Sequence, residues 1–256
     1  MVKVQSGNVA AAWLASPVSA GPPNQVLLVS DFDGTLAEIV PEPTTATPLP
    51  ESLDAVRRLA SALRKVVILS NRTNAELNSL IEVPGALVIG DSGLPPPTAE
   101  ELQALRVFNA EAAKRLGTIP GAWIEVKPAS SAVHFRNAPI SGQELLDVLR
   151  PLLEQTALYG GLGRKVIEVH SPKAGKGNTL EALLKRYAPG GLVCMGDDEN
   201  DRSVFDVASK ASIPHLCVGV GSAEVPRDLF DHCDLIVEGP AEASAFLQTL
   251  VEWAKA

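Results

Sequence analysis

The sequence predicts an α/β fold in which a doubly wound parallel sheet is interrupted by a smaller α+β insert. Apolar runs without polar alternation, typical of strands buried on both faces, alternate with amphipathic helical segments near both ends of the chain. Between Pro95 and Lys176 this alternation gives way to helix, strand hairpin, helix and strand. We therefore predict an N-terminal extension, a two-part core and an inserted cap domain: 1–24, 25–95 with 172–256, and 96–171.

The first core segment shows a β-α-β-α-β order, which implies a parallel sheet. A short helix at 9–15 precedes it, within an extension that is otherwise rich in proline and glycine. Apolar runs give the strands, and apolar residues at helical spacing give the helices. The predicted elements are strand 26–29, helix 51–62, strand 66–69, helix 74–81 and strand 86–89.

The insert begins with a helix at 98–116, where Thr98 and Glu101 form the pattern of a capping box. Strands 122–127 and 132–136, helix 141–155 and strand 165–169 complete it. The alternating core pattern then resumes to the end of the chain. Its elements are helix 178–187, strand 192–195, helix 201–208, strands 215–220 and 234–237, and helix 241–253.

Composition narrows the class of protein. A formal net charge of −8 over 256 residues argues against broad binding of nucleic acids or anionic membranes. The three cysteines have no metal-ligand spacing, so we expect buried reduced thiols and a cytoplasmic protein. No apolar run reaches the length of a membrane span, and we expect neither a signal peptide nor a membrane partner. We expect a monomer.

Two carboxylates follow the first core strand. Asp31 and Asp33 lie where that strand ends, which is where open α/β sheets bind ligands, and a Gly34-Thr35 turn follows. Because two close carboxylates repel each other, a cation is their expected partner, and hard oxygen ligands favour Mg²⁺. We interpret Asp31 as a nucleophile and Asp33 as a general acid and base. An ordinary Asp- and Gly-rich turn is the alternative.

Three further polar positions occur at strand ends or helix starts. Ser70 could donate a hydrogen bond to phosphate or simply cap a helix. Lys176 could neutralise a phosphoryl group at a helix N-terminus or be an ordinary solvated lysine. The segment 196–201, which contains four acidic residues, follows a buried strand. Its carboxylates would repel one another unless they surround a cation. Since the carboxyl ends of parallel strands meet at one edge, we expect these side chains to share one pocket.

These motifs resemble those of the haloacid dehalogenase superfamily of phosphotransferases. Asp31-x-Asp33-Gly34-Thr35, Ser70, Lys176 and Gly196-Asp197-Asp198 match its four motifs in order, and the α/β insert is similar to its C2 cap class. More narrowly, the chain resembles the trehalose-6-phosphate phosphatase family. The matching pieces are 31–37, 125–127, 131–136, Glu168, Lys176-Gly177, and 196–198 with Asp201.

Three motifs depart from the pattern usual in that family. Asn71 replaces the glycine of Ser-Gly-Arg, Ser92 replaces the histidine of Gly-x-His-Gly, and Asn200-Asp201-Arg202 replaces Thr-Asp-Glu. The Asn-Asp pair is closer to general sugar-phosphate phosphatases of the same cap class. These departures leave phosphatase chemistry intact and bear on which sugar is recognised.

The resemblance implies a Rossmann-like core and a Mg²⁺-dependent phosphatase. Asp31 would form an aspartyl-phosphate, and Asp33 would protonate the leaving oxygen and later activate water. Ser70 and Lys176 would hold phosphoryl oxygens. Asp31, the Asp33 carbonyl and Asp197 would hold the metal, with Asp201 in support, and the remaining implied substrate contacts are Gly34, Thr35, Asn71 and Arg72.

The cap would recognise the sugar of a small sugar phosphate. Strand alternation places Glu125 with Lys127 on one face, and His134 with Arg136 on one face of the next strand. The spacing alone fits equally a solvent-facing hairpin with cross-strand charge pairs. The resemblance favours substrate binding by these four residues and Glu168. Trp123 and Phe135 are expected to pack within the cap rather than to stack on the sugar.

Other functions stay open at this point. Another enzyme of the same cap class could act on sucrose phosphate or on a glycosyl-phosphoglycerate, and a phosphosugar mutase would use the same nucleophile. A binding module of a different class would be an inactive sugar-phosphate sensor. The intact Asp31, Asp33, Lys176 and Asp197 argue against the sensor, which has no need of a nucleophile.

Overall fold

The structure is a computed structural model that describes residues 4–5, 8–40, 42–94, 97–163, 165–172, 175–222 and 227–255. The chain forms two compact units. The core unit comprises Met1–Gly93 and Lys176–Ala256, and the cap unit comprises Leu94–Gly175. The N-terminal segment thus belongs to the core unit.

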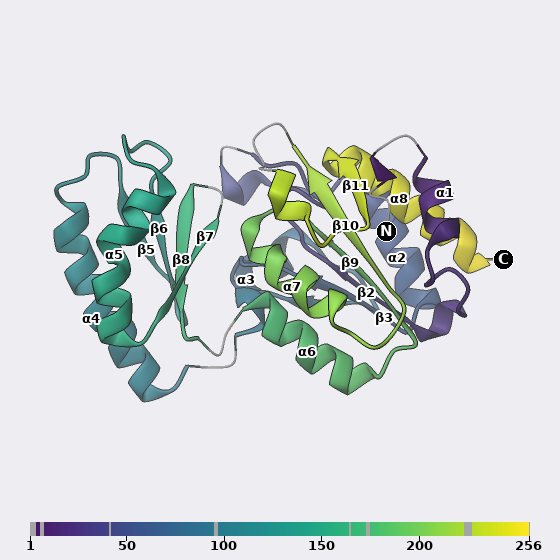
Figure 1. The fold of residues 1–256 in the computed structure, drawn as a ribbon, viewed down its shortest axis with the longest axis horizontal. Helices are drawn as coiled ribbons and strands as arrows, with labels where there is room; N and C mark the ends of the chain where they lie inside the picture. The colour runs from purple at the N-terminus through teal and green to yellow at the C-terminus, as the bar shows by residue number, and fades with distance from the viewer. Residues whose placement is uncertain are drawn as a thin grey trace. The chain divides into compact units, whose positions relative to one another are not determined.

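The core unit is built on a seven-stranded sheet in which every described neighbour pair is parallel (Figure 1). This confirms the predicted doubly wound fold, because helices cover both faces. In sheet order the strands are β1 (Val4–Gln5), β11 (Leu235–Glu238), β10 (His215–Gly221), β9 (Gly191–Gly196), β2 (Val26–Ser30), β3 (Lys65–Leu69) and β4 (Leu87–Ile89).

Two hydrophobic clusters lie on opposite faces of this sheet. Val26 and Leu28 of β2 belong to one, while the alternate residues Leu27 and Val29 belong to the other. The central strand is therefore apolar throughout because it is buried on both faces. On the first face lie α1 (Val9–Ala15), α2 (Pro50–Ala62), α3 (Asn74–Leu80) and α8 (Gly239–Lys255), and on the second lie α6 (Lys176–Tyr187) and α7 (Glu199–Ser209).

The N-terminal segment is integrated into the core rather than lying apart from it. Strand β1 pairs with β11 at the edge of the sheet, and the helix expected at 9–15 is α1. Trp13 of α1 is fully buried, and its ring packs edge-on against Phe246 and Trp253 of α8. Short 3-10 turns occur at Pro23–Gln25, Pro43–Thr45, Asp91–Gly93 and Arg227–Phe230.

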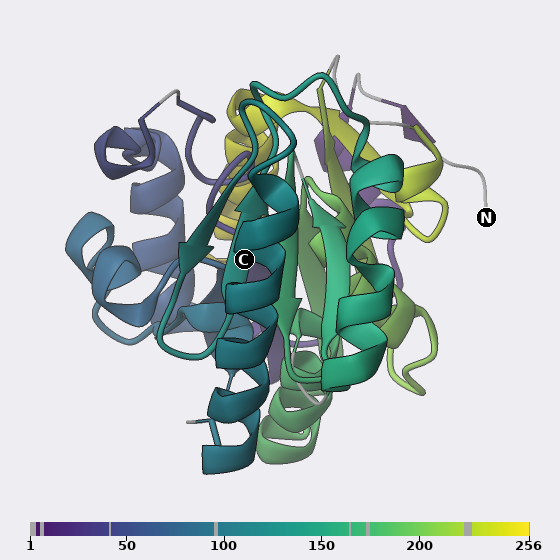
Figure 2. The same cartoon turned by 90° about the vertical axis from the view of Figure 1, so that its left-hand side faces the viewer.

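The cap unit is a four-stranded antiparallel sheet with two helices on one face, as Figures 1 and 2 both show. Helices α4 (Ala99–Leu116) and α5 (Gly142–Thr156) cover Val133, Ile167 and Val169. Capping boxes begin both helices, at Thr98 and Ser141, and the first confirms the prediction. In sheet order the strands are β5 (Trp123–Val126), β6 (Ser131–His134), β8 (Val166–His170) and β7 (Tyr159–Gly163).

The opposite face of the cap sheet carries polar and aromatic side chains. Trp123 is paired with His134 across β5 and β6, and Glu125 and Glu168 both pair with Ala132. Directly paired residues and alternate residues of one strand project to the same face, so these side chains share it. We call this face, defined by Trp123, Glu125, His134 and Glu168, the open face of the cap sheet.

No helix among the described residues is both long enough and apolar enough to span a bilayer.

Candidate active site

Side chains predicted to act in catalysis or to bind metal follow three neighbouring strands of the core sheet, at its carboxyl edge. Asp31 and Asp33 follow β2, Ser70 follows β3, and Asp197 follows β9. The backbone N–H of Asp31 donates to the carbonyl of Met195 at 2.9 Å, which ties the first loop to β9. Parallel pairing therefore gathers residues that are far apart in the sequence.

Lys176 begins helix α6 and is buried between two carboxylates. Its Nζ donates to Oδ1 of Asp31 at 2.7 Å and to Oδ1 of Asp201 at 2.8 Å. Burial alone would lower the pKa of Lys176, but the charges of Asp201 and Asp31 raise it well above its usual value. The lysine is therefore a fixed positive charge beside Asp31.

Oxygens of Asp31, Asp197 and Asp201 lie within 4.8 Å of one another, and all three residues are buried. Burial raises the pKa values of Asp31 and Asp197 well above their usual range, and nearby carboxylates add to this. A cation would relieve that cost, and hard oxygen donors suit Mg²⁺. The residues present thus fit a divalent cation.

Asp201 also organises the loop that carries Asp197. Its Oδ2 accepts hydrogen bonds from the backbone N–H groups of Asp197 at 3.0 Å and Asp198 at 3.2 Å. Asp198 is the N-cap of α7, and burial together with the charge of Asp201 raises its pKa to about 6. The acidic run is thus held by the start of a helix rather than by a loose turn.

Gly34 allows the first loop to pass close to Asp197. It has φ of +77°, and a Cβ there would lie 2.0 Å from Oδ2 of Asp197. Any side chain would therefore displace this carboxylate and strain the backbone. Thr35 is fully buried, and its hydroxyl has no hydrogen-bond partner among the described residues.

Arg72 forms a bidentate ion pair with Asp33. Its Nε and Nη2 donate to the two carboxylate oxygens, each at 2.7 Å. Burial acts to lower the pKa of Arg72, but the hydrogen bonds to Asp33 raise it. The Asp33 side chain is thus engaged by Arg72, so a metal contact through Asp33 would use its backbone carbonyl. The sequence pattern did not indicate this pair.

Ser92, in the turn after β4, links the loop that follows β3 to helix α6. The Ser92 hydroxyl donates to Oδ1 of Asn71, and the Thr179 hydroxyl donates to the Ser92 carbonyl at 2.7 Å. Ser70 is buried, and its Oγ accepts from the backbone N–H of Arg72 at 3.2 Å. Asn71 and Ser92, two positions that depart from the usual family pattern, therefore contact each other.

On the open face of the cap sheet the predicted substrate residues form charge pairs. Nε2 of His134 lies 2.8 Å from Oε2 of Glu125, and Nζ of Lys127 lies 3.6 Å from Oε1 of Glu168. The His134 contact lowers the pKa of Glu125, whereas burial raises that of Glu168. Arg136 is exposed beyond the end of β6. The cross-strand charge pairs weighed above are therefore present.

The expectation that Trp123 packs within the cap is wrong, while the same expectation for Phe135 is confirmed. Phe135 is 4% exposed and joins the cap core, but Trp123 is 54% exposed. The Trp123 ring stacks on His134, with centroids 4.2 Å apart and an angle of 17° between planes. Alternation along β5 places it beside Glu125 on the open face, away from α4 and α5.

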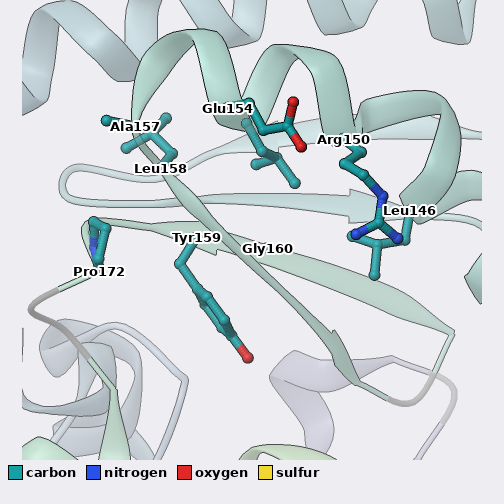
Figure 3. A pocket seen from close by; sticks show the side chains of 9 residues that line it. Leu146, Arg150, Glu154, Ala157, Leu158, Tyr159, Gly160 and Pro172 are labelled. Atoms are coloured by element: carbon teal, nitrogen blue, oxygen red, sulfur yellow. The ribbon is translucent and has the colours of Figure 1, made fainter.

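The cap also has a shallow cavity of about 440 Å³ between α5 and β7 (Figure 3). Its walls are mainly apolar, with Arg150 and Glu154 at the helix side. None of the predicted site residues lines it. It therefore plays no part in the site described here.

The family model and the curated relatives that match this chain point to the same family. The trehalose-phosphatase family model matches residues 29–233. The trehalose-phosphate phosphatase of Mycobacterium ulcerans is 35% identical over 194 residues, which are 69% of this chain and 50% of that protein. That of Mycobacterium avium is 33% identical over 241 residues, 87% of this chain and 61% of that protein. The chain spans about half the length of the first curated relatives.

The fold also matches solved structures. The C-terminal domain of Candida albicans trehalose-6-phosphate phosphatase superposes with a TM-score of 0.72 at 19% sequence identity, covering 95% of each chain. At that identity the likeness shows the fold alone. The fold comparison therefore agrees with the layered core and cap described above.

Proposed function

The chain belongs to the trehalose-phosphatase family, and from that premise we propose that it hydrolyses trehalose 6-phosphate to trehalose and phosphate. The observation that carries this proposal is the buried group formed by Asp31, Lys176 and Asp201 at the carboxyl edge of the core sheet. It pairs a nucleophile with a fixed positive charge, which is the requirement for attack on a phosphate dianion.

In the first chemical step a carboxylate oxygen of Asp31 forms a bond to phosphorus. The bond between phosphorus and the sugar oxygen breaks, and that oxygen takes a proton from Asp33. Ser70 and Lys176 donate to the phosphoryl oxygens, where negative charge is spread in the transition state. The products of this step are free trehalose and a phosphorylated Asp31.

In the second step Asp33 takes a proton from water, and the water oxygen attacks phosphorus. The bond between phosphorus and the Asp31 oxygen breaks, which returns the carboxylate and releases phosphate. Before the first step Arg72 holds Asp33 in place through both of its oxygens. For Asp33 to carry a proton to the leaving oxygen, one of its two oxygens must be released from Arg72 when the substrate binds, while the contact to the other oxygen keeps the carboxyl group in position.

We propose Mg²⁺ as the cofactor, held by Asp31, the Asp33 carbonyl and Asp197, with Asp201 positioning the loop. When bound it would offset the repulsion between the Asp31 carboxylate and the incoming phosphate. Support comes from the three buried carboxylates whose oxygens lie within 4.8 Å of one another. The donor set is entirely oxygen, as Mg²⁺ prefers.

We propose substrate contacts in each of the two units, taken separately. In the core, Gly34, Thr35, Asn71 and Arg72 would contact the phosphate side, and the unpartnered Thr35 hydroxyl supports a contact of this kind. In the cap, the sugar hydroxyls would bond to Glu125, Lys127, His134, Arg136 and Glu168. These residues offer both donors and acceptors, as a disaccharide needs.

We further propose that the protein acts as a cytoplasmic monomer. Its three cysteines are buried and none of them forms a disulfide, which suits a reducing compartment.

The proposal is tested by measuring phosphate release with Mg²⁺ from four substrates: trehalose 6-phosphate, sucrose 6-phosphate, glucose 6-phosphate and a glycosyl-phosphoglycerate. We expect kcat/KM for trehalose 6-phosphate to exceed each of the others by at least about tenfold, the lower end of what a few polar contacts achieve. A stronger preference for another sugar phosphate would reassign the substrate. No release from any of them would favour a sugar-phosphate sensor.

A further inference from the structure

Trp123 is an aromatic residue that the fold leaves largely exposed. This residue begins β5, an outer strand of the cap sheet, and lies outside the cap's hydrophobic cluster as far as the described residues show. At 54% exposure a large apolar ring contributes little to folding by burial. A stacked aromatic that the fold does not bury is a candidate for binding.

The indole ring of Trp123 is held in place by its neighbours. Its inner face stacks on the imidazole of His134, which is itself fixed by the carboxylate of Glu125 at 2.8 Å. Just before the strand, Gly121 has φ of +83°, and a Cβ there would lie 2.2 Å from the carbonyl oxygen of Asn137. A side chain at this position would clash with that carbonyl, so the chain enters β5 through a glycine. The stacking on a fixed imidazole preorganises the indole.

The side chains that share the open face with Trp123 offer both hydrogen-bond donors and acceptors. The charges on the open face are paired, Glu125 with His134 and Lys127 with Glu168. The side chains of Lys127 and Glu168 are only 11% and 13% exposed, so they are partly desolvated. Two carboxylates disfavour an anion, whereas paired donors and acceptors beside an apolar ring suit a neutral polyol.

We propose that Trp123, stacked on His134, is a platform for one pyranose ring of the substrate, which makes it a specificity-determining residue. The C–H groups of a pyranose face pack on an aromatic face, and its hydroxyl groups reach Glu125 and Glu168 at the ring edge. This inference rests on the proposed function for the identity of the sugar. It adds an apolar contact to a site otherwise assigned only charged residues.

The test compares Trp123→Ala, Trp123→Phe and a control variant, Val126→Ala. Val126 is 64% exposed and lies on the same strand as Trp123, but alternation along β5 turns its side chain to the opposite face of the sheet. We expect Trp123→Ala to raise KM for trehalose 6-phosphate at least about tenfold, with Trp123→Phe retaining most of the affinity. Hydrolysis of acetyl phosphate, which has no ring to stack, should be unchanged in all three.

Equal loss on both substrates, or an unchanged KM for the sugar phosphate in Trp123→Ala, would overturn the platform. A second measurement does not depend on turnover: titration with trehalose should quench the fluorescence of the wild-type protein and not that of Trp123→Phe. If the wild type fails to hydrolyse trehalose 6-phosphate but shows the Trp123-dependent quenching, the proposed function fails while the platform stands. If the wild type hydrolyses trehalose 6-phosphate normally but trehalose does not quench its fluorescence, the proposed function stands and the platform is wrong.

Discussion

At the residue scale, Lys176 and its two carboxylate partners show how much stability the candidate active site costs. The side chains of Lys176, Asp31 and Asp201 are between 3% and 6% exposed, so each charge depends on the others. Removing one partner of such a group leaves a buried unpaired charge, which typically costs about 3–5 kcal/mol. Apolar side chains at these positions would give an equal or higher free energy of unfolding. The buried charges are therefore explained by their proposed role in phosphoryl transfer and not by stability.

Arg72 gives the first prediction at this scale. Arg72→Lys keeps the charge but replaces the bidentate contact with Asp33 by a single one. We expect kcat for trehalose 6-phosphate to fall about 10- to 100-fold, because a mispositioned general acid loses part of its contribution. The fall should be smaller for p-nitrophenyl phosphate, whose leaving group needs little protonation. Steady-state kinetics on both substrates measure this difference.

The control is Arg58→Lys. Arg58 forms an exposed ion pair with Asp54 one turn away on α2, at 3.0 Å, and contacts no predicted site residue by that pair. Its kinetics should match those of the wild type. An equal loss on both substrates in Arg72→Lys would mean that Arg72 does not act through Asp33.

Individual contacts were less predictable than the residues that make them. Asp31, Ser70, Lys176 and Asp197 could be located because strand ends of a parallel sheet converge. The pairing of Arg72 with Asp33, and of Asn71 with Ser92, could not. Each joins loops that follow different strands, and loop geometry leaves no periodic trace in the sequence.

At the scale of elements, apolar strands and capped helices were predicted to within a few residues, and weak strands were missed. The sequence of β7, Tyr159–Gly163, contains three glycines and has low intrinsic strand propensity. It becomes a strand because it pairs along its length with β8. Similarly, the two-residue β1 exists only through its pairing with β11. Tertiary pairing, not local sequence, determines both.

Helix α1 gives a prediction about stability. Trp13 fills a space against Phe246 and Trp253, so Trp13→Ala removes a fully buried ring and leaves a cavity. We expect the free energy of unfolding to fall by about 3–5 kcal/mol, as for other large-to-small core changes. Urea denaturation measures this loss.

Leu14 is the matched control on the same helix. It is 71% exposed, so Leu14→Ala should change the free energy of unfolding by no more than about 0.5 kcal/mol. If both variants had the same small effect, the N-terminal segment would be an appendage rather than part of the core.

At the scale of the whole molecule, each of the two units has its own hydrophobic core, and the functional side chains predicted in one unit differ in kind from those in the other. The core unit gathers buried carboxylates and a lysine, which suit phosphoryl transfer. The cap sheet presents paired charges and an exposed indole, which suit a neutral sugar. The sequence indicated this division through its change of pattern after Pro95 and its return at Lys176. The alternation that places Glu125 and Lys127 on one face places Trp123 there as well, so the outward position of Trp123 could have been predicted from the sequence.

The most direct test of the account is the rate of phosphate release from trehalose 6-phosphate by the wild-type protein and by Asp31→Asn. We expect the variant to lose at least about a thousandfold in kcat, because the nucleophile is gone, while it still binds the substrate. Quenched reactions of the wild type should also yield a peptide carrying one phosphoryl group on Asp31. A variant that turns over at the wild-type rate would contradict the account, since hydrolysis would then not depend on Asp31.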